Sequence, residues 1–221
     1  MLDPGGALSS AIIQDRQFTI TPADFSGWEI LNNSFKPYAA CHLTHPAIDA
    51  ARSLRLPRES LAGVEGIDAR VGALAHQITG GKSGAPETSL EGKFDLKYCV
   101  ALALAGRTLS ASDFSEPFKP EPEILSLSRK VDAVSSSSHG YSSAAIIVRF
   151  SNGEERQAEI AIAKGHPGNP MTWADMRDKF RGLIGSDSQM DEVFNELRQC
   201  GSSSCRALQA IERVAASDAA L

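Results

Sequence analysis

Two β-rich runs, residues 144–150 and 155–163, flank the sequence Ser151-Asn152-Gly153. The first run reads Ala-Ala-Ile-Ile-Val-Arg-Phe, and its branched and aromatic side chains favour extended backbone. Asn-Gly is the strongest short hairpin signal, because both central residues of the tightest turn need positive φ. This feature limits the possible folds more than any other in the chain, and it predicts an antiparallel β-hairpin.

Simpler patterns mark other elements. Alternation of apolar and polar residues over 64–71 predicts a second strand. Residues 28–35 are also expected to form a strand, which would place Lys36 at its end. Short helices are predicted from Pro46 to about Leu54 and over residues 123–129.

The stretch from Phe94 to Ala105 is almost entirely apolar and ends at Gly106, the residue type that typically caps a helix C-terminus. A helix that is apolar on all sides is buried on all sides, so the hydroxyl of Tyr98 needs a partner in the core. A glycine-rich segment, residues 79–84, does not match a phosphate-binding loop, and we interpret it as a flexible loop.

The last fifty residues predict three amphipathic helices. Thr172 and Asp175 resemble a capping box at the start of the first. Apolar residues at helical spacing mark the faces of the three helices: Met176, Phe180 and Leu183; Met190, Val193, Phe194 and Leu197; Leu208, Ile211 and Ala215. These faces need something to pack against, so we expect self-association, most simply as a symmetric dimer.

The expected fold class is α+β: a small antiparallel-sheet domain with packed helices, followed by an all-helical C-terminal segment. Residues 1–24 carry Gly, Ser and Pro with little periodicity and are expected to be loosely ordered. The α+β domain is expected over residues 25–165, and the helical segment over residues 166–221.

Composition excludes several classes of function. The 221 residues carry a net charge of −5 and a pI near 5.6, which argues against a nucleic-acid binder. No apolar run is long enough to span a membrane, and residues 1–6 do not resemble a signal peptide. We therefore expect a cytoplasmic protein with neither nucleic-acid nor membrane partners.

Cysteine spacing gives no metal motif. Cys41, Cys99, Cys200 and Cys205 match neither a zinc site nor an iron–sulfur run, and free thiols are expected in a cytosolic chain. We expect no metal and no cofactor.

The segment 34–51 holds the densest group of chemically active residues. It reads Ser-Phe-Lys-Pro-Tyr-Ala-Ala-Cys-His-Leu-Thr-His-Pro-Ala-Ile-Asp-Ala-Ala. Pro46 suits the first turn of a helix, which places His45 at a helix N-terminus, where an anion is favoured. Lys36, Cys41 and His42 lie close by in sequence. The pattern favours a site that holds a carboxylate and moves a proton, although a solvated loop before an ordinary helix would show the same residues.

Three motifs in order resemble the MmgE/PrpD family, which includes 2-methylcitrate dehydratases. The first is Lys-Pro-Tyr…Thr-His-Pro-Ala-Ile-Asp-Ala, residues 36–50. The second is Lys-Phe-Asp-Leu-Lys-Tyr, residues 93–98, and the third is Gly-His-Pro-Gly-Asn-Pro-Met-Thr, residues 165–172. The resemblance covers the chain from about Phe25 and implies the family's inserted α+β domain together with the helices that return to its large helical domain.

The resemblance implies lyase-type chemistry: a proton is removed beside a carboxylate of a small di- or tricarboxylic acid, followed by dehydration, decarboxylation or epimerisation. It makes Lys36, His45 and Tyr98 the candidate catalytic residues. Lys36 would clamp a carboxylate or donate a proton, His45 would act as an acid, base or hydrogen-bond donor, and Tyr98 would supply a hydroxyl. The candidate substrate-binding residues are Lys93 together with Cys41 and His42, of which either one could be the residue that faces the pocket.

The family's helical domain supplies another part of the active site, and this sequence has no counterpart of it. The chain is therefore expected to be incomplete without a separate chain carrying that domain, or to work with a second copy of itself. The alternative is a non-catalytic relative that acts as a binding or oligomerisation module.

Overall fold

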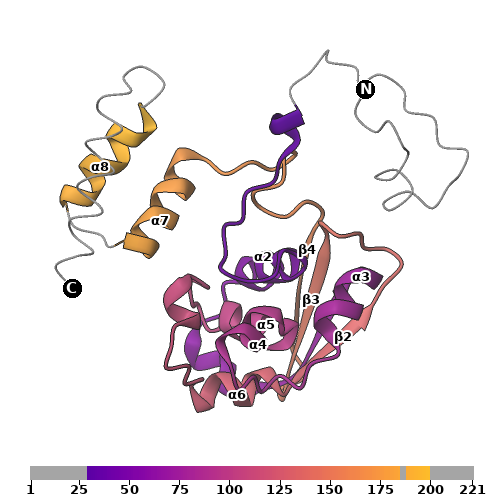
Figure 1. Cartoon of the computed structure of the whole chain (residues 1–221). Helices are drawn as coiled ribbons and strands as arrows, with labels where there is room; N and C mark the ends of the chain where they lie inside the picture. The colour runs from indigo at the N-terminus through magenta and orange to yellow at the C-terminus, as the bar shows by residue number, and fades with distance from the viewer. Residues whose placement is uncertain (1–28, 185–187, 200–221) are drawn as a thin grey trace, which may run out of the picture. The chain divides into compact units, whose positions relative to one another are not determined.

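The protein is described by a computed structural model that covers residues 29–184 and 188–199 (Figure 1). The chain divides into two compact units, residues 1–33 and 34–221. In the first unit the described residues form a short 3-10 helix, η1 (Glu29–Asn32). The predicted strand is therefore wrong over these four residues. The backbone closes a local turn there, in which Asn33 N–H donates to the Ile30 carbonyl at 3.2 Å.

Four strands form one mixed sheet in the order β2-β1-β3-β4. Their bounds are β1 (Val64–Val71), β2 (Val131–Ser135), β3 (Ala144–Phe150) and β4 (Glu155–Ile160). β1 pairs antiparallel with β3 but parallel with β2. The α+β class is confirmed, while the expected antiparallel sheet contains one parallel pair, because the helices between β1 and β2 return the chain to the starting edge.

The predicted hairpin is present, with Ala144 opposite Ile160 and Arg149 opposite Glu155. Only the glycine of the Asn-Gly pair has positive φ, at 84°. Gly153 N–H donates to the Phe150 carbonyl at 2.9 Å, and the Asn152 side chain accepts the Glu154 N–H at 2.9 Å. The connection is thus longer than the two-residue turn that the sequence predicted.

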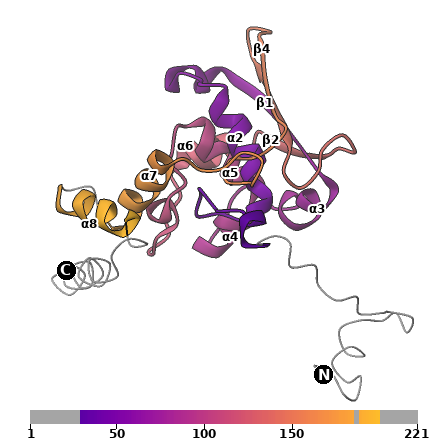
Figure 2. The same cartoon turned by 90° about the horizontal axis from the view of Figure 1, so that it is seen from above.

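Helices cover one face of the sheet. α2 (His45–Ser53) contacts β3 and β4, and α5 (Leu96–Leu104) contacts β2 and α2; both views show the two helices together on this face (Figures 1 and 2). The core between them is formed by fully buried side chains, which include Ile48, Ile67, Leu96, Val100, Ile146 and Val148. The predicted helix at Pro46 and the predicted strand at 64–71 are both confirmed.

α5 is buried along its whole length apart from Lys97, as its apolar sequence predicted. It begins at Leu96 because the side chain of Asp95 accepts the N–H groups of Lys97 and Tyr98, at 2.9 and 3.1 Å. A separate helix, α4 (Ser89–Phe94), precedes it. Gly106 ends α5 with φ 75°, and Arg107 N–H returns to the Leu102 carbonyl at 2.9 Å.

The remaining elements between α2 and β2 are short. They are η3 (Arg58–Gly63), α3 (Ala73–Ala75), the π-helix η4 (His76–Gly80), η5 (Ala111–Phe114) and α6 (Pro122–Ser128). α6 confirms the helix predicted over 123–129. The loop predicted over 79–84 is shorter than expected, because Thr79 and Gly80 are buried at the end of η4.

Two helices follow the sheet, α7 (Trp173–Ile184) and α8 (Ser188–Arg198), as predicted. Thr172 and Asp175 form the expected reciprocal capping contacts, at 2.7 and 3.2 Å. Phe194 of α8 packs against Phe180 of α7, with ring centroids 5.4 Å apart. The third predicted helix, residues 208–215, and the N-terminal segment 1–24 lie outside the described residues. No helix in the described ranges has the length and apolarity needed to cross a bilayer.

We expect Asp95→Ala to lower the free energy of unfolding by about 1–2 kcal/mol, because it leaves the N–H groups of Lys97, Tyr98 and Gly84 without their acceptor. Burial raises the pKa of Asp95, so desolvation of this carboxylate offsets part of the gain. The measurement is urea unfolding followed by circular dichroism.

Asp95→Asn retains one acceptor oxygen and is expected to lose less stability than Asp95→Ala. Asp132→Ala, at an exposed position of β2, serves as the control and should stay within about 0.5 kcal/mol of wild type. Equal stability of Asp95→Ala and the control would contradict the capping role.

Candidate functional site

The segment that carries Lys36 is held by backbone hydrogen bonds to three distant parts of the chain. Phe35 N–H donates to Gly165 O, Ala39 N–H to Leu109 O, and Cys41 N–H to Lys93 O, each at 2.8 Å. Gly165 has φ 86°, and a Cβ there would overlap the Phe35 carbonyl oxygen. Glycine is therefore required for residues 35 and 165 to approach this closely.

Lys36 and His45 meet at one carbonyl group. The exposed Lys36 donates from Nζ to Ala40 O at 3.3 Å, and His45 Nε2 lies 3.3 Å from the same oxygen. His42 stacks on His45, with ring centroids 5.0 Å apart. Three of the residues singled out from the sequence, one lysine and two imidazoles, are thus brought together.

His45 is fully buried. Its Nδ1 atom is buried without a hydrogen-bond partner. Burial, reinforced by His42, lowers the pKa of His45 to about 3. The imidazole is therefore neutral near pH 7, so it can donate or accept a hydrogen bond but carries no positive charge.

The helix end beside His45 is less open to an anion than its sequence predicted. A 3-10 turn, η2 (His42–Thr44), runs directly into α2. His45 N–H donates to the His42 carbonyl, and Thr44 N–H donates to the Cys41 carbonyl at 2.9 Å. Two N–H groups at this end are thus already satisfied by the chain.

His42 is only half-buried. Desolvation lowers its pKa, and the positive charge of Lys36 lowers it further. A neutral imidazole beside an ammonium group is able to accept a proton. Cys41, a free thiol, and Lys93 lie next to this group, since their backbones are hydrogen-bonded to each other at 2.8 Å.

Tyr98 lies apart from this cluster. Its ring packs edge-on against Phe114 and Phe118, with centroid distances of 6.4 and 6.0 Å. It lines a separate cavity of about 320 Å³ that also contains Arg107 and Asp113. Burial raises the pKa of Tyr98 to about 12, so its hydroxyl stays protonated. Within the described ranges, no hydrogen bond joins Tyr98 to Lys36 or His45.

Two residues that sequence reasoning did not single out belong to the cluster. Tyr38 donates its hydroxyl to Asp49 Oδ1 at 2.5 Å, and its ring meets the His45 ring edge-on, with centroids 5.2 Å apart. Asp49 follows His45 by one helical turn, which places both on the same face of α2. That spacing was the available sequence signal.

A cavity of about 680 Å³ opens beside Lys36 and Tyr38, bounded on its other side by α7. Its charged lining residues are four cations and two acids: Lys36, Arg52, Lys164, Lys179, Asp175 and Asp178. Asp175 is paired with Lys164 at 2.8 Å, and burial of this pair is outweighed by hydrogen bonds that lower the pKa of Asp175 to about 2. The cavity therefore has an excess of positive charge, which suits an anionic ligand.

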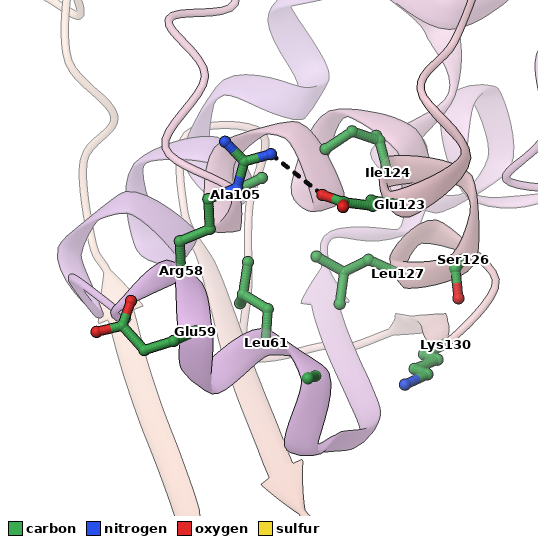
Figure 3. Close-up of a pocket in the computed structure, with 10 residues that line it drawn as sticks. Arg58, Glu59, Leu61, Ala105, Glu123, Ile124, Ser126, Leu127 and Lys130 are labelled. Atoms are coloured by element: carbon green, nitrogen blue, oxygen red, sulfur yellow. Dashed lines mark hydrogen bonds and ion pairs between the residues drawn. The ribbon is translucent and has the colours of Figure 1, made fainter.

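A second cavity, of about 450 Å³, lies between η3 and α6 (Figure 3). Arg58 and Glu123 form an ion pair across it at 3.1 Å, but both side chains are largely exposed. Its cations, Arg58 and Lys130, are matched by Glu59 and Glu123, and Lys130 Nζ is already bonded to the Val64 carbonyl. None of the residues predicted from the sequence lines it, and its balanced charge does not favour an anion.

The low pKa of His45 predicts that the free energy of unfolding depends on pH. The unfolded histidine titrates near pH 6.5, so the unfolded chain gains this proton at a higher pH than the folded one. Stability should then fall as pH is lowered from about 6.5 towards 3, with a loss of roughly 2 kcal/mol between about pH 7.5 and about pH 5.

Urea unfolding of wild type and His45→Gln at these two pH values measures this loss. The pH-dependent loss should be smaller in His45→Gln, whereas Gln77→Ala, at an exposed position without a titratable group, should keep the wild-type dependence. An identical pH dependence in wild type and His45→Gln would show that His45 is not held neutral.

Among the described residues, no group of His, Cys, Asp and Glu is arranged to hold a metal ion.

Comparison with known proteins and protein families shows what the chain is similar to. No curated protein matches the chain. A family model, the MmgE/PrpD C-terminal domain, matches residues 38–200, most of the 221-residue sequence. The matched range contains His42, His45, Lys93 and Tyr98 and begins two residues after Lys36. The chain therefore belongs to the MmgE/PrpD family and represents its C-terminal domain.

Proposed function

We propose that this chain is the C-terminal part of an MmgE/PrpD-type lyase that binds a small di- or tricarboxylic acid. The observation that carries the proposal is the position of Lys36, which lies at the cation-rich cavity and also next to the two stacked histidines. A volume of about 680 Å³ is ample for an acid of this size. An ammonium group beside it would neutralise a substrate carboxylate.

The proposed chemistry is removal of a proton from the carbon next to a carboxylate. Lys36 would hold the carboxylate on which negative charge develops. His42 would accept the proton, because its lowered pKa keeps it neutral and it is partly exposed. His45, neutral and buried, would act as a hydrogen-bonding group rather than as a charged acid.

Cys41 and Lys93 are proposed as substrate-binding residues beside this group. Tyr98 would act from its own cavity, on a part of the site completed by the family's helical domain. In a dehydration, the hydroxyl group on the neighbouring carbon would then leave as water; in an epimerisation, a proton would be delivered to the opposite face of the carbanion. In a decarboxylation, loss of carbon dioxide would itself create the carbanion in place of proton removal, and a proton donor would then protonate that carbon.

Exposed apolar side chains support a partner surface next to the site. Leu90 and Phe94 are one turn apart on α4, and Leu74 and Ile78 are one turn apart on α3 and η4; all four are exposed. Both helices adjoin the 41–44 turn, through the Cys41–Lys93 hydrogen bond and through contacts of η2 with α3. We propose that this apolar surface docks the helical domain or, without it, a second copy of the chain, which also favours the alternative function as a non-catalytic binding or oligomerisation module.

Calorimetric titration of the purified chain with citrate, 2-methylcitrate and cis-aconitate tests the binding proposal. We expect binding of at least one acid, and we expect Lys36→Ala to weaken it about tenfold or more through loss of the charge, equivalent to about 1.4 kcal/mol. The control is Lys82→Ala, which removes an exposed lysine from a loop outside the site. Absence of heat with all three acids would argue against the binding proposal and favour the non-catalytic alternative.

Sedimentation velocity over a range of concentrations tests self-association. We expect wild type to form dimers and Leu90→Glu to sediment as a monomer, because burying a charge on the apolar surface costs free energy. Val134→Glu places the same charge on a half-exposed position of β2 and should leave the dimer intact. A wild-type monomer at every concentration would rule out self-association of the isolated chain.

A further inference from the structure

The side chain of Asp49 joins three segments that are distant in sequence. Asp49 itself belongs to α2. Its Oδ1 accepts the Tyr38 hydroxyl at 2.5 Å, and its Oδ2 accepts the backbone N–H of Lys164 at 2.7 Å. Both oxygens of one half-buried carboxylate are therefore used, each by a different segment.

The direction of the Tyr38 hydrogen bond follows from electrostatics. Burial and the adjacent Asp49 raise the pKa of Tyr38 far above its usual range, so the phenol is protonated and donates. The acceptor is a carboxylate, and hydrogen bonds to ionised acceptors are stronger and shorter than neutral ones. The contact therefore fixes the tilt of the Tyr38 ring.

The Tyr38 ring lines the candidate site. The rings of Tyr38 and His45 are nearly perpendicular, with centroids 5.2 Å apart, and Tyr38 also lines the cation-rich cavity. Lys36 precedes it by two residues, so the orientation of Tyr38 also restrains the backbone that carries the ammonium group.

The opposite wall of the cavity is tied to the same carboxylate. Lys164, whose N–H bonds to Asp49, pairs through Nζ with Asp175 of α7. Lys179 of α7 in turn donates to the Lys36 carbonyl at 2.7 Å. These contacts form a closed series. Asp49 contacts Lys164, Lys164 contacts α7, α7 contacts the backbone of Lys36, and Tyr38, two residues after Lys36, contacts Asp49 again.

We infer that Asp49 is a positioning residue of the site: through Tyr38 it orients the His45 ring and the Lys36 segment, and through Lys164 it sets the α7 wall of the cavity. Asp49 does not line the cation-rich cavity, and it acts through its neighbours. The expected effect of Asp49 on affinity rests on the proposed binding of a carboxylic acid. The expected effect of Asp49 on the orientation of the Tyr38 and His45 rings does not depend on any ligand.

The first experiment needs no ligand. In wild type, nuclear Overhauser cross-peaks between the ring protons of Tyr38 and His45 are expected. Asp49→Ala should abolish them while the amide resonances of β1 and β3 remain in place, and Asp132→Ala should preserve them. Should Asp49→Ala not fold, Asp49→Asn, which keeps the volume and one acceptor oxygen, should weaken the cross-peaks. Unchanged cross-peaks in the folded Asp49 variant would overturn the inference.

The second experiment is a double-mutant cycle on the affinity for cis-aconitate, citrate or 2-methylcitrate. Asp49→Ala and Tyr38→Phe are each expected to weaken binding about tenfold, and the double variant no further, because the two residues act as one unit. Partial recovery of affinity in Asp49→Asn relative to Asp49→Ala would support orientation as the cause. The inference would be overturned if the double variant bound about a hundredfold more weakly than wild type, as independent effects predict, or if Asp49→Ala left the affinity unchanged.

The two experiments separate the possible failures. If wild type binds none of the acids, the binding proposal fails, while the Tyr38–His45 cross-peaks still decide whether Asp49 orients the ring. If wild type binds but Asp49→Ala binds equally well with intact cross-peaks, the binding proposal stands and the positioning role is wrong.

Discussion

The burial of α5 on nearly every side is the constraint on which the rest of the domain depends. A helix with no polar face must be covered all round, and here α2, α4, α6, η4 and β2 supply that cover. Each large side chain buried in this way contributes about 1.5–3 kcal/mol. The turns at both ends of α5 follow from its burial, because the orphan groups must be satisfied inside the protein by Asp95 and by the backbone after Gly106.

The candidate site lies where segments far apart in the chain meet beside this core. Residues 35–41 follow a path set by hydrogen bonds to residues 93, 109 and 165. No local propensity brings these segments together. Their meeting depends on a glycine at 165 that allows close backbone contact and on the carboxylate of Asp49, which bonds to both sides of the junction.

Electrostatics at this junction favour neutral imidazoles next to the positively charged lysines. His45 is fully buried, and its ionisation would place a positive charge in a desolvated site near Lys36 and Lys179. Desolvation and like charge therefore act in the same direction and keep the ring neutral. Lys36 and Lys179 lie at the cavity wall, where their positive charge favours an anion.

The sequence by itself determined the elements whose signal is local. The β3–β4 hairpin, the strand Val64–Val71, α2 and the buried α5 follow from turn chemistry, alternation, proline placement and apolar content. It also determined the family, through three ordered motifs. The strand expected over residues 28–35 was wrong over Glu29–Asn32, because the backbone there closes local 3-10 turns and does not pair with a strand. Only the tertiary structure decided the parallel pairing of β1 with β2, the separation of Tyr98 from Lys36, and the contact of Asp49 with Lys164. These features depend on which distant segments pack together, and packing is a property of the whole chain.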